Sequence, residues 1–327
     1  MRNFVLDPTD LQGMEAHLLE LGWISGTDSL SAEPIGQGNM NLTLRVRTNQ
    51  RSFILKQARP WVEKYPTIKA PVERAAIEAT FYRIVRDHRK LAARMPRFLG
   101  FDEAANLLCL EDMGEEGDFT SSYGAGGLEE INCRVLTEYL SSLHEIQVSP
   151  KDLPILRNRA MRSLNHEHQY DLPLKMDSRS YLDGITNGLS DIWKRLRSDP
   201  QYCAGVRGLG QIYLADGSAL VHGDFFPGSW LRTQEGPLVI DGEFCFLGPP
   251  EYDLGIFLAH LEFLGVRSLW SVVETSYRGM ADWQLVRRFS GAEIMRRLIG
   301  VAQLPIVASL ENKRQWLELS RSLVCAG

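Results

Sequence analysis

The sequence lacks the cysteine pairs, long apolar runs and basic runs that mark several classes of protein. Its 327 residues include five cysteines, none of them in a C-x-x-C pair, which argues against a zinc site and a disulfide framework. No apolar run approaches the roughly 20 residues that span a bilayer, and charge and proline interrupt the N-terminus too early for a signal peptide. The net charge of −5 comes with no long basic run. We therefore expect a cytoplasmic protein with no membrane segment and no nucleic-acid partner.

Length and local pattern together predict two lobes. A chain of 327 residues exceeds the usual size of one hydrophobic core. Alternating apolar runs and helix-like segments come first, at residues 11–21 (helix), 32–57 (hairpin), 71–89 (helix), 97–100 and 106–111 (strands). A glycine-rich stretch then leads to mainly helical segments, at residues 128–147, 178–197, 253–264, 281–301 and 311–323. We predict an α+β fold whose N-terminal lobe, residues 1–113, has a small antiparallel sheet with a helix, and whose larger C-terminal lobe, residues 114–327, is mainly helical.

Three acidic residues follow two short apolar strands of the second lobe. Asp224 comes directly after His222 and a glycine, whereas Asp241 and Glu243 end the next strand, two positions apart. A carboxylate in the first loop can orient a hydroxyl and take up its proton late in phosphoryl transfer. Two hard oxygen ligands at i and i+2 suit a magnesium ion that bridges nucleotide phosphates. A turn residue and a solvated strand end are the structural alternatives, but the pattern as a whole predicts a small-molecule kinase.

A nucleotide site is predicted in the first lobe. Gly36, Gly38 and Asn39 precede a hairpin strand, where glycines let backbone N–H groups approach phosphate oxygens. Lys56 ends an apolar strand, and Glu78 lies in the following helix, at a spacing compatible with the ion pair that fixes a lysine against ATP phosphates. Each residue alone also fits an ordinary turn or a solvated surface. Their order along the chain favours ATP binding by residues 1–113.

Three further residues of the second lobe are expected to support the site. His222 lies two positions before Asp224. Ser229 either offers its hydroxyl to a metal or phosphate or closes the turn in which it lies. Asp253 is expected to cap a helix or to orient a loop, and it is not expected to react.

Taken together, these motifs resemble the aminoglycoside phosphotransferase and choline kinase superfamily, and within it the methylthioribose kinase branch. The residues that carry the resemblance extend over most of the chain: Gly36-x-Gly38-Asn39-x-Asn41, Lys56-Gln57-Ala58, His222-Gly223-Asp224, Gly228-Ser229, Asp241-x-Glu243-Phe244-x-Phe246-x-Gly248-Pro249 and Glu293-x-x-Arg296-Arg297-x-x-Gly300. The resemblance implies a bilobal protein-kinase-like fold, ATP and Mg²⁺, Asp224 as catalytic base, and Asp241 and Glu243 as metal ligands. It also implies an adenine-binding hinge from Glu111 to Met113 and a homodimer.

The resemblance also concerns the phosphoryl acceptor. Spacing alone favours a surface location for Arg296 and Arg297, but in the methylthioribose kinase branch the paired arginines belong to the sugar site, which makes both candidate substrate contacts. Tyr65 lies where the family has an aromatic-proline loop near the active site. Two departures are Phe226, where much of the family has histidine, and Gly242, which replaces the usual proline. We predict transfer to a sugar hydroxyl, that of 5-methylthioribose or a related furanose.

Two alternatives stay open. A kinase of an aminoglycoside, choline or homoserine would need an acidic acceptor pocket, and arginines facing that pocket would repel a cationic substrate. A nucleotide-binding pseudokinase with a regulatory role is the other alternative, and it is excluded only by observed transfer. Protein kinase activity has the least support, because Asp241-Gly242-Glu243 is not the usual Asp-Phe-Gly.

Overall fold

A computed structural model describes residues 4–26, 29–36, 40–123, 127–175, 179–301, 303–304 and 306–326. The chain forms two compact units. The first unit comprises Met1–Gly117 and Leu238–Cys245, and the second comprises Asp118–Pro237 and Phe246–Gly327. A lobe boundary was expected near Met113; the chain leaves the first unit after Gly117 and returns to it for eight residues from Leu238.

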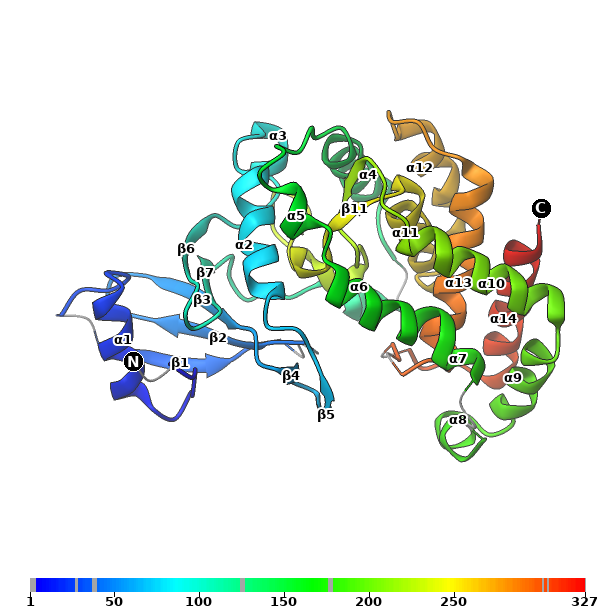
Figure 1. Cartoon of the computed structure of the whole chain (residues 1–327), viewed down its shortest axis with the longest axis horizontal. Helices are drawn as coiled ribbons and strands as arrows, with labels where there is room; N and C mark the ends of the chain where they lie inside the picture. The colour runs from blue at the N-terminus through cyan, green and yellow to red at the C-terminus, as the bar shows by residue number, and fades with distance from the viewer. Residues whose placement is uncertain are drawn as a thin grey trace. The chain divides into compact units, whose positions relative to one another are not determined.

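An antiparallel sheet of five strands forms the centre of the first unit (Figure 1). The strand order is β1-β2-β3-β7-β6. The strands are β1 (Ser31–Pro34), β2 (Leu42–Arg47), β3 (Ser52–Gln57), β6 (Phe98–Asp102) and β7 (Leu107–Glu111). In the predicted β2–β3 hairpin, Leu44 lies opposite Leu55 and Val46 opposite Phe53. All four side chains are fully buried, so the alternation seen in the sequence marks the core face of the sheet.

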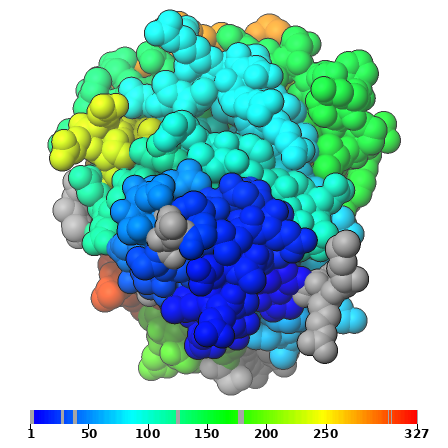
Figure 2. Space-filling model, turned by 90° about the vertical axis from the view of Figure 1, so that its left-hand side faces the viewer, coloured from blue at the N-terminus to red at the C-terminus, as the bar shows by residue number. Residues whose placement is uncertain are grey.

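Helix α1 (Leu11–Glu20) packs on that core face. Asp10 caps its N-terminus by accepting a hydrogen bond from Gly13 N at 2.9 Å. Met14 and Leu18, one turn apart, are buried with the inward side chains of β2 and β3. Figure 2 shows the outer side of this arrangement, where the dark blue atoms of α1 lie beside the lighter blue atoms of the following strands.

Helix α2 and a small hairpin complete the N-terminal part of the first unit. The helix predicted over residues 71–89 is confirmed as α2 (Arg74–Val85), followed by the short α3 (Arg89–Ala92). The hairpin consists of β4 (Trp61–Val62) and β5 (Tyr65–Lys69). The returning segment adds β10 (Leu238–Val239) and the 3₁₀ turn η4 (Gly242–Phe244). Turn η4 packs against α2, which brings the end of the returning segment to the face of the unit that carries Glu78.

The second unit is mainly helical, as predicted. Its helices are α4 (Glu130–His144), α5 (Leu153–Leu156), α6 (Arg159–His166), α7 (Leu172–Lys175), α8 (Arg179–Ile185), α9 (Leu189–Arg197), α10 (Pro200–Leu214), α11 (Pro250–Phe263), α12 (Trp270–Ser276), α13 (Trp283–Ile299) and α14 (Leu310–Cys325). Shorter elements are η1 (Phe119–Ser122), the π-helical turn η2 (Glu167–Asp171), η3 (Pro227–Ser229), η5 (Arg267–Leu269), β8 (Ala219–Val221), β9 (Trp230–Leu231) and β11 (Phe246–Gly248). The single helix predicted over residues 178–197 is wrong, because Gly188 adopts a φ of +86° and separates α8 from α9.

Helix α13 lies at the centre of this unit, packed against α11 and α14 (Figure 1). A Cβ on Gly255 of α11 would lie 2.5 Å from Cβ of Phe289 on α13, so the glycine permits the close approach of these two helices. All residues of α13 from Phe289 to Ile299 are buried, charged ones included. No helix among the described residues is long and apolar enough to cross a membrane.

Candidate functional site

Lys56 lies among three carboxylates in the first unit. Its Nζ is 2.9 Å from Glu78 Oε1, 2.6 Å from Asp241 Oδ1 and 3.8 Å from Glu243 Oε1. Strand β3 supplies the lysine, α2 supplies Glu78, and the returning segment supplies the other two. The predicted ion pair between Lys56 and Glu78 is therefore present, and the two acidic residues predicted to bind metal lie beside it.

Glu243 is held by two residues to which the sequence analysis assigned no role. Asn41 Nδ2 donates to Glu243 Oε2 at 2.9 Å, and Arg74 Nε lies 3.3 Å from the same oxygen. Arg74 Nε also donates to Asn41 Oδ1 at 2.9 Å, and its Nη2 donates to the carbonyl of Met40 at 2.9 Å. Arg74 is fully buried. Its guanidinium joins the residues just before β2, helix α2 and turn η4 into one polar cluster.

The cluster carries an excess of negative charge. Three carboxylates face two cations, Lys56 and Arg74, which leaves a formal charge of −1. Burial and the neighbouring carboxylates raise the pKa of Glu78 to about 7, although Lys56 opposes this shift. Burial alone would lower the pKa of Lys56, but the Asp241, Glu78 and Glu243 carboxylates outweigh burial and raise it well above its ordinary value. Lys56 therefore stays protonated, and the net negative charge of the cluster can accept a further cation.

The chemistry of this cluster suits a magnesium ion at Asp241. The Asp241 side chain is 41% exposed. Its backbone adopts a φ of +66°, in the left-handed region that aspartate tolerates. Residues in this region are often found at functional sites. Magnesium typically uses one or two carboxylates and completes its shell with waters and substrate phosphates. No group of three or more His, Cys, Asp or Glu residues suited to a metal occurs in the described part of the chain. The Glu243 side chain is only 4% exposed, so as a ligand it would share its oxygens with Asn41 and Arg74.

The other residues expected at the nucleotide site lie on the same unit. Gly36 follows β1 with a φ of +68°, whereas Gly38 and Asn39 lie outside the described residues. Glu111 ends β7 and accepts a hydrogen bond from Arg97 Nε at 2.9 Å. Met113 follows two positions later.

A contact missed by sequence reasoning fixes the segment that follows β7. Arg45 on β2 donates from Nε and Nη2 to the two carboxylate oxygens of Asp112, at 2.8 and 3.0 Å. It also donates to the carbonyl of Gly114. This two-pronged pair ties residues 112–114 to the sheet.

Gly242 has a packing role in η4. A Cβ at this position would lie 2.3 Å from Cδ1 of Phe81 on α2. The glycine that replaces the family's usual proline therefore lets η4 pack directly against an aromatic side chain.

In the second unit, two arginines converge on Asp224. Nη2 of Arg296 and Nη2 of Arg297 donate to the same oxygen, Asp224 Oδ1, at 3.0 and 3.1 Å. The surface location that spacing alone favoured for the arginines is wrong, because both are buried on α13. The contacts bring together three residues predicted for the acceptor side of the site. Tyr65, the fourth, is half-buried on β5 of the first unit.

Glu293, one helical turn earlier, holds both guanidinium groups. It accepts from Arg296 Nε through Oε2 and from Arg297 Nε through Oε1, the latter at 2.7 Å. Burial would raise the pKa of Glu293, but the two arginines outweigh burial and lower it well below its usual range. Two arginines thus face two carboxylates, Glu293 and Asp224, and their formal charges cancel. The face of Arg297 also lies over the Phe226 ring, 4.5 Å from its centroid.

The loop that carries Asp224 is fixed by Asp253. This fully buried carboxylate accepts from His222 N at 2.6 Å and from Gly223 N at 2.9 Å. His144 Nε2 lies 3.1 Å from Asp253 Oδ2. Ser229 Oγ donates to the carbonyl of Asp224 at 2.8 Å, so the buried hydroxyl closes the turn. These contacts hold the backbone on both sides of the Asp224 carboxylate.

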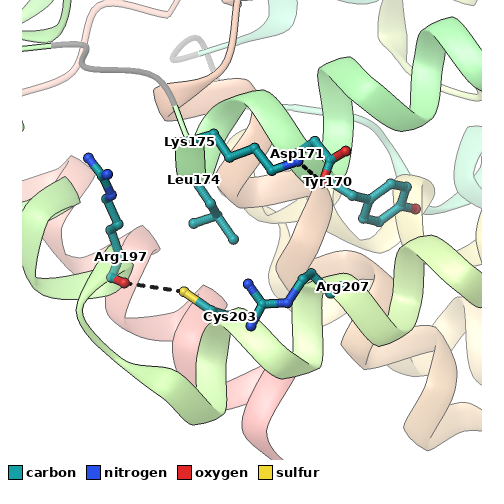
Figure 3. Close-up of a pocket in the computed structure, with 7 residues that line it drawn as sticks. All are labelled: Tyr170, Asp171, Leu174, Lys175, Arg197, Cys203 and Arg207. Carbon is teal, nitrogen blue, oxygen red and sulfur yellow. Dashed lines mark hydrogen bonds and ion pairs between the residues drawn. The ribbon is translucent and has the colours of Figure 1, made fainter.

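A separate cavity of about 200 Å³ lies elsewhere in the second unit. Its lining residues come from η2, α7, α9 and α10: Tyr170, Asp171, Leu174, Lys175, Arg197, Cys203 and Arg207 (Figure 3). Lys175 is paired with Asp171, and the Cys203 thiol points to the carbonyl of Arg197. None of the predicted site residues lines this cavity, so it has no part in the site described above.

Comparison with known proteins finds sequence relatives over most of the chain. Residues 31–287 match the phosphotransferase enzyme family. The methylthioribose kinase of Exiguobacterium sibiricum is 26% identical, over 91% of this chain and 89% of that protein. The methylthioribose kinase of Geobacillus sp. strain WCH70 is 23% identical, over 97% of this chain and 90% of that protein.

Solved structures confirm the fold that the resemblance implied. A spectinomycin phosphotransferase in complex with ADP and spectinomycin matches with a TM-score of 0.59 at 13% identity, over 95% of this chain and 97% of that one. Choline kinase from Streptococcus pneumoniae matches with a TM-score of 0.53 at 12% identity, over 97% of this chain and 99% of that one. The family match covers most of the chain and includes Lys56, Glu78, Asp224, Asp241 and Glu243, whereas Glu293, Arg296 and Arg297 lie beyond its end. The chain therefore belongs to the phosphotransferase enzyme family and is a small-molecule kinase.

Proposed function

We propose that this kinase transfers the γ-phosphate of ATP to a hydroxyl of a neutral sugar, 5-methylthioribose or a related furanose. One observation carries the choice of acceptor: Arg296 and Arg297 both donate to Asp224 Oδ1. Two guanidinium groups beside the catalytic carboxylate disfavour a cationic acceptor and offer N–H donors to sugar oxygens. The methylthioribose kinases that match this chain over most of its length support the same choice.

In this proposal the first unit binds the nucleotide phosphates. Lys56 stays protonated and offers its positive charge to the phosphate oxygens, while Glu78 keeps its ammonium group in place. Asp241 would hold magnesium, assisted by Glu243, and the ion would neutralise charge on the phosphates when bound. The backbone from Gly36 to Asn39 would cover the phosphates, and Glu111 to Met113 would contact the adenine.

The second unit binds the acceptor. Both guanidinium contacts to Asp224 fall on Oδ1, so Oδ2 is the oxygen that would accept a hydrogen bond from the acceptor hydroxyl. Asp224 orients this hydroxyl and takes its proton late in the transfer. The arginines fix the carboxylate and contact the sugar. Asp253 keeps the loop in the conformation that presents Asp224.

The test is an ADP-release assay with Mg²⁺ across 5-methylthioribose, 5-deoxyribose, ribose, choline, homoserine and an aminoglycoside. We expect turnover with one furanose, and a loss of about 100- to 10,000-fold in the Asp224→Ala variant. The Asp224→Asn variant is the matched control for shape, because it keeps the side chain's size and removes its basicity.

Turnover with choline or an aminoglycoside and none with a furanose would contradict the sugar assignment and support the amino-alcohol alternative. Magnesium-dependent ATP binding without transfer to any acceptor would favour the pseudokinase. Near-normal turnover in both Asp224 variants would overturn the role given to this carboxylate.

A further inference from the structure

A buried histidine continues the polar network behind the arginines. His260 lies on α11 and is fully buried. Its Nε2 is 3.1 Å from Glu293 Oε1, and its Nδ1 is 2.6 Å from the hydroxyl of Tyr123, which follows η1. A continuous path of hydrogen-bonded groups thus runs from Tyr123 through His260 and Glu293 to the two arginines and Asp224.

The chemistry of the neighbours fixes where the protons lie in this path. Burial lowers the pKa of His260 to about 4, so the imidazole is neutral at neutral pH and carries one proton. Glu293 is ionised and can only accept a hydrogen bond. The proton of His260 therefore lies on Nε2, and Nδ1 accepts from the Tyr123 hydroxyl. The Tyr123 hydroxyl and the His260 Nε2–H then each donate to an acceptor.

The orientation of Glu293 sets the direction of both guanidinium groups. Each of its oxygens accepts one arginine Nε, and Oε1 accepts the His260 N–H in addition. Rotation of the carboxylate would pull both Nη2 atoms away from Asp224 Oδ1. We propose that His260 and Tyr123 are positioning residues of the acceptor site, which hold Glu293 and thereby keep Arg296 and Arg297 directed at Asp224. The expected kinetic effects of this proposal rest on the proposed function. The hydrogen bonds among His260, Glu293 and the arginines do not.

The structural consequence is tested by NMR of the full-length protein without substrate. We expect ¹⁵N shifts of His260 that identify a neutral ring with its proton on Nε2. We also expect the Nε–H signals of Arg296 and Arg297 to keep their shifts and slow exchange in His260→Gln, whose amide can still donate to Glu293. His260→Asn is too short to reach Glu293 and should shift both signals. A proton on Nδ1, or unchanged arginine signals in His260→Asn, would overturn the proposal.

The kinetic consequence separates positioning from a general loss of stability. A hydrogen bond to a charged group contributes about 1.5–3 kcal/mol, so His260→Asn should raise the KM for the acceptor by about 10- to 100-fold. The KM for ATP should stay unchanged, and His260→Gln should restore the acceptor KM to within a few-fold of the wild-type value. Tyr123→Phe should show a smaller increase of the same kind.

Thermal unfolding of each variant shows whether it is folded at the assay temperature. If His260→Asn is unfolded at the assay temperature, the acceptor KM values of His260→Gln and Tyr123→Phe, compared with that of the wild type, decide whether the two residues position the acceptor site. Equal changes in the KM for ATP and for the acceptor would indicate a merely structural residue. If no acceptor is phosphorylated by the wild type, the proposed function fails, and the NMR result still decides the positioning roles.

Discussion

Lys56 Nζ lies 2.6 Å from Asp241 Oδ1, although the two residues are separated by 185 positions in the sequence. The contact is formed inside the first unit, because residues 238–245 return to it from the second. The lysine is thereby shared between a carboxylate of α2 and one of the returning segment. The same ammonium group serves the fold and the proposed nucleotide site.

Replacement of Lys56 by methionine should lower the free energy of unfolding by about 3–5 kcal/mol, because it leaves Glu78 buried without its cation. Chemical denaturation would measure this loss. The double variant Lys56→Met/Glu78→Leu should regain much of the stability and stay inactive in the ADP-release assay. A single variant as stable as the wild type would contradict the importance of the buried pair.

Gly242→Ala should destabilise the first unit. The added Cβ would lie 2.3 Å from Phe81 Cδ1, and overpacking of this kind costs about 1–3 kcal/mol. Urea denaturation measures the change. Combination with Phe81→Leu, which replaces the ring by a smaller side chain, should recover part of the loss. If Phe81→Leu makes the alanine variant still less stable, the contact between η4 and α2 is not the cause.

His260 predicts a dependence of stability on pH. Its folded-state pKa is about 4, below the ordinary value of 6.5, so the unfolded chain binds more protons between these values. The contribution of the neutral His260 to the free energy of unfolding is therefore fully present well above pH 6.5 and is lost as the pH is lowered. From pH 6.5 to 5 the loss should reach about 2 kcal/mol. Denaturation at a series of pH values should show this slope in the wild type and a smaller slope in His260→Gln; identical slopes would contradict burial of a neutral imidazole.

Asp253→Asn should impair turnover more than folding. One carboxylate oxygen would become an NH₂ group facing an N–H donor of the His222–Gly223 backbone, which displaces the loop that presents Asp224. We expect kcat to fall by about tenfold or more, since the loss of one such bond costs about 1–3 kcal/mol. Steady-state kinetics with the preferred acceptor and a melting curve measure the two effects. A variant that loses stability and keeps its kcat would show that Asp253 acts only in folding.

The parts of the structure with a local pattern were predictable. Alternation in β2 and β3 identified the hairpin, and the order of Lys56 and Glu78 along the chain identified their ion pair. Asp224, Asp241 and Glu243 were visible because each follows a short apolar strand. These features depend on residues close in sequence or on the order of motifs along the chain.

The contacts between segments far apart in the sequence had no such signal. Arg74 begins α2 like any surface arginine, and nothing in its neighbourhood indicates that its side chain reaches Asn41 and Glu243. His260 lies within the otherwise apolar stretch Leu254–Leu261 of α11, where a buried histidine has many explanations. Burial of Arg296 and Arg297 could not be read from their spacing, because the packing of α11 and α14 around α13 decides it.

The return of residues 238–245 to the first unit has a consequence for the order in which the protein is made. When Met1–Gly117 has emerged from the ribosome, Asp241, Gly242 and Glu243 have not yet been synthesised. Until residues 238–245 emerge, the contact between Phe81 and η4 cannot form, and the Lys56 ammonium group can pair only with Glu78. The N-terminal unit can reach its final form only after Cys245 has left the exit tunnel, when much of the second unit has also been synthesised.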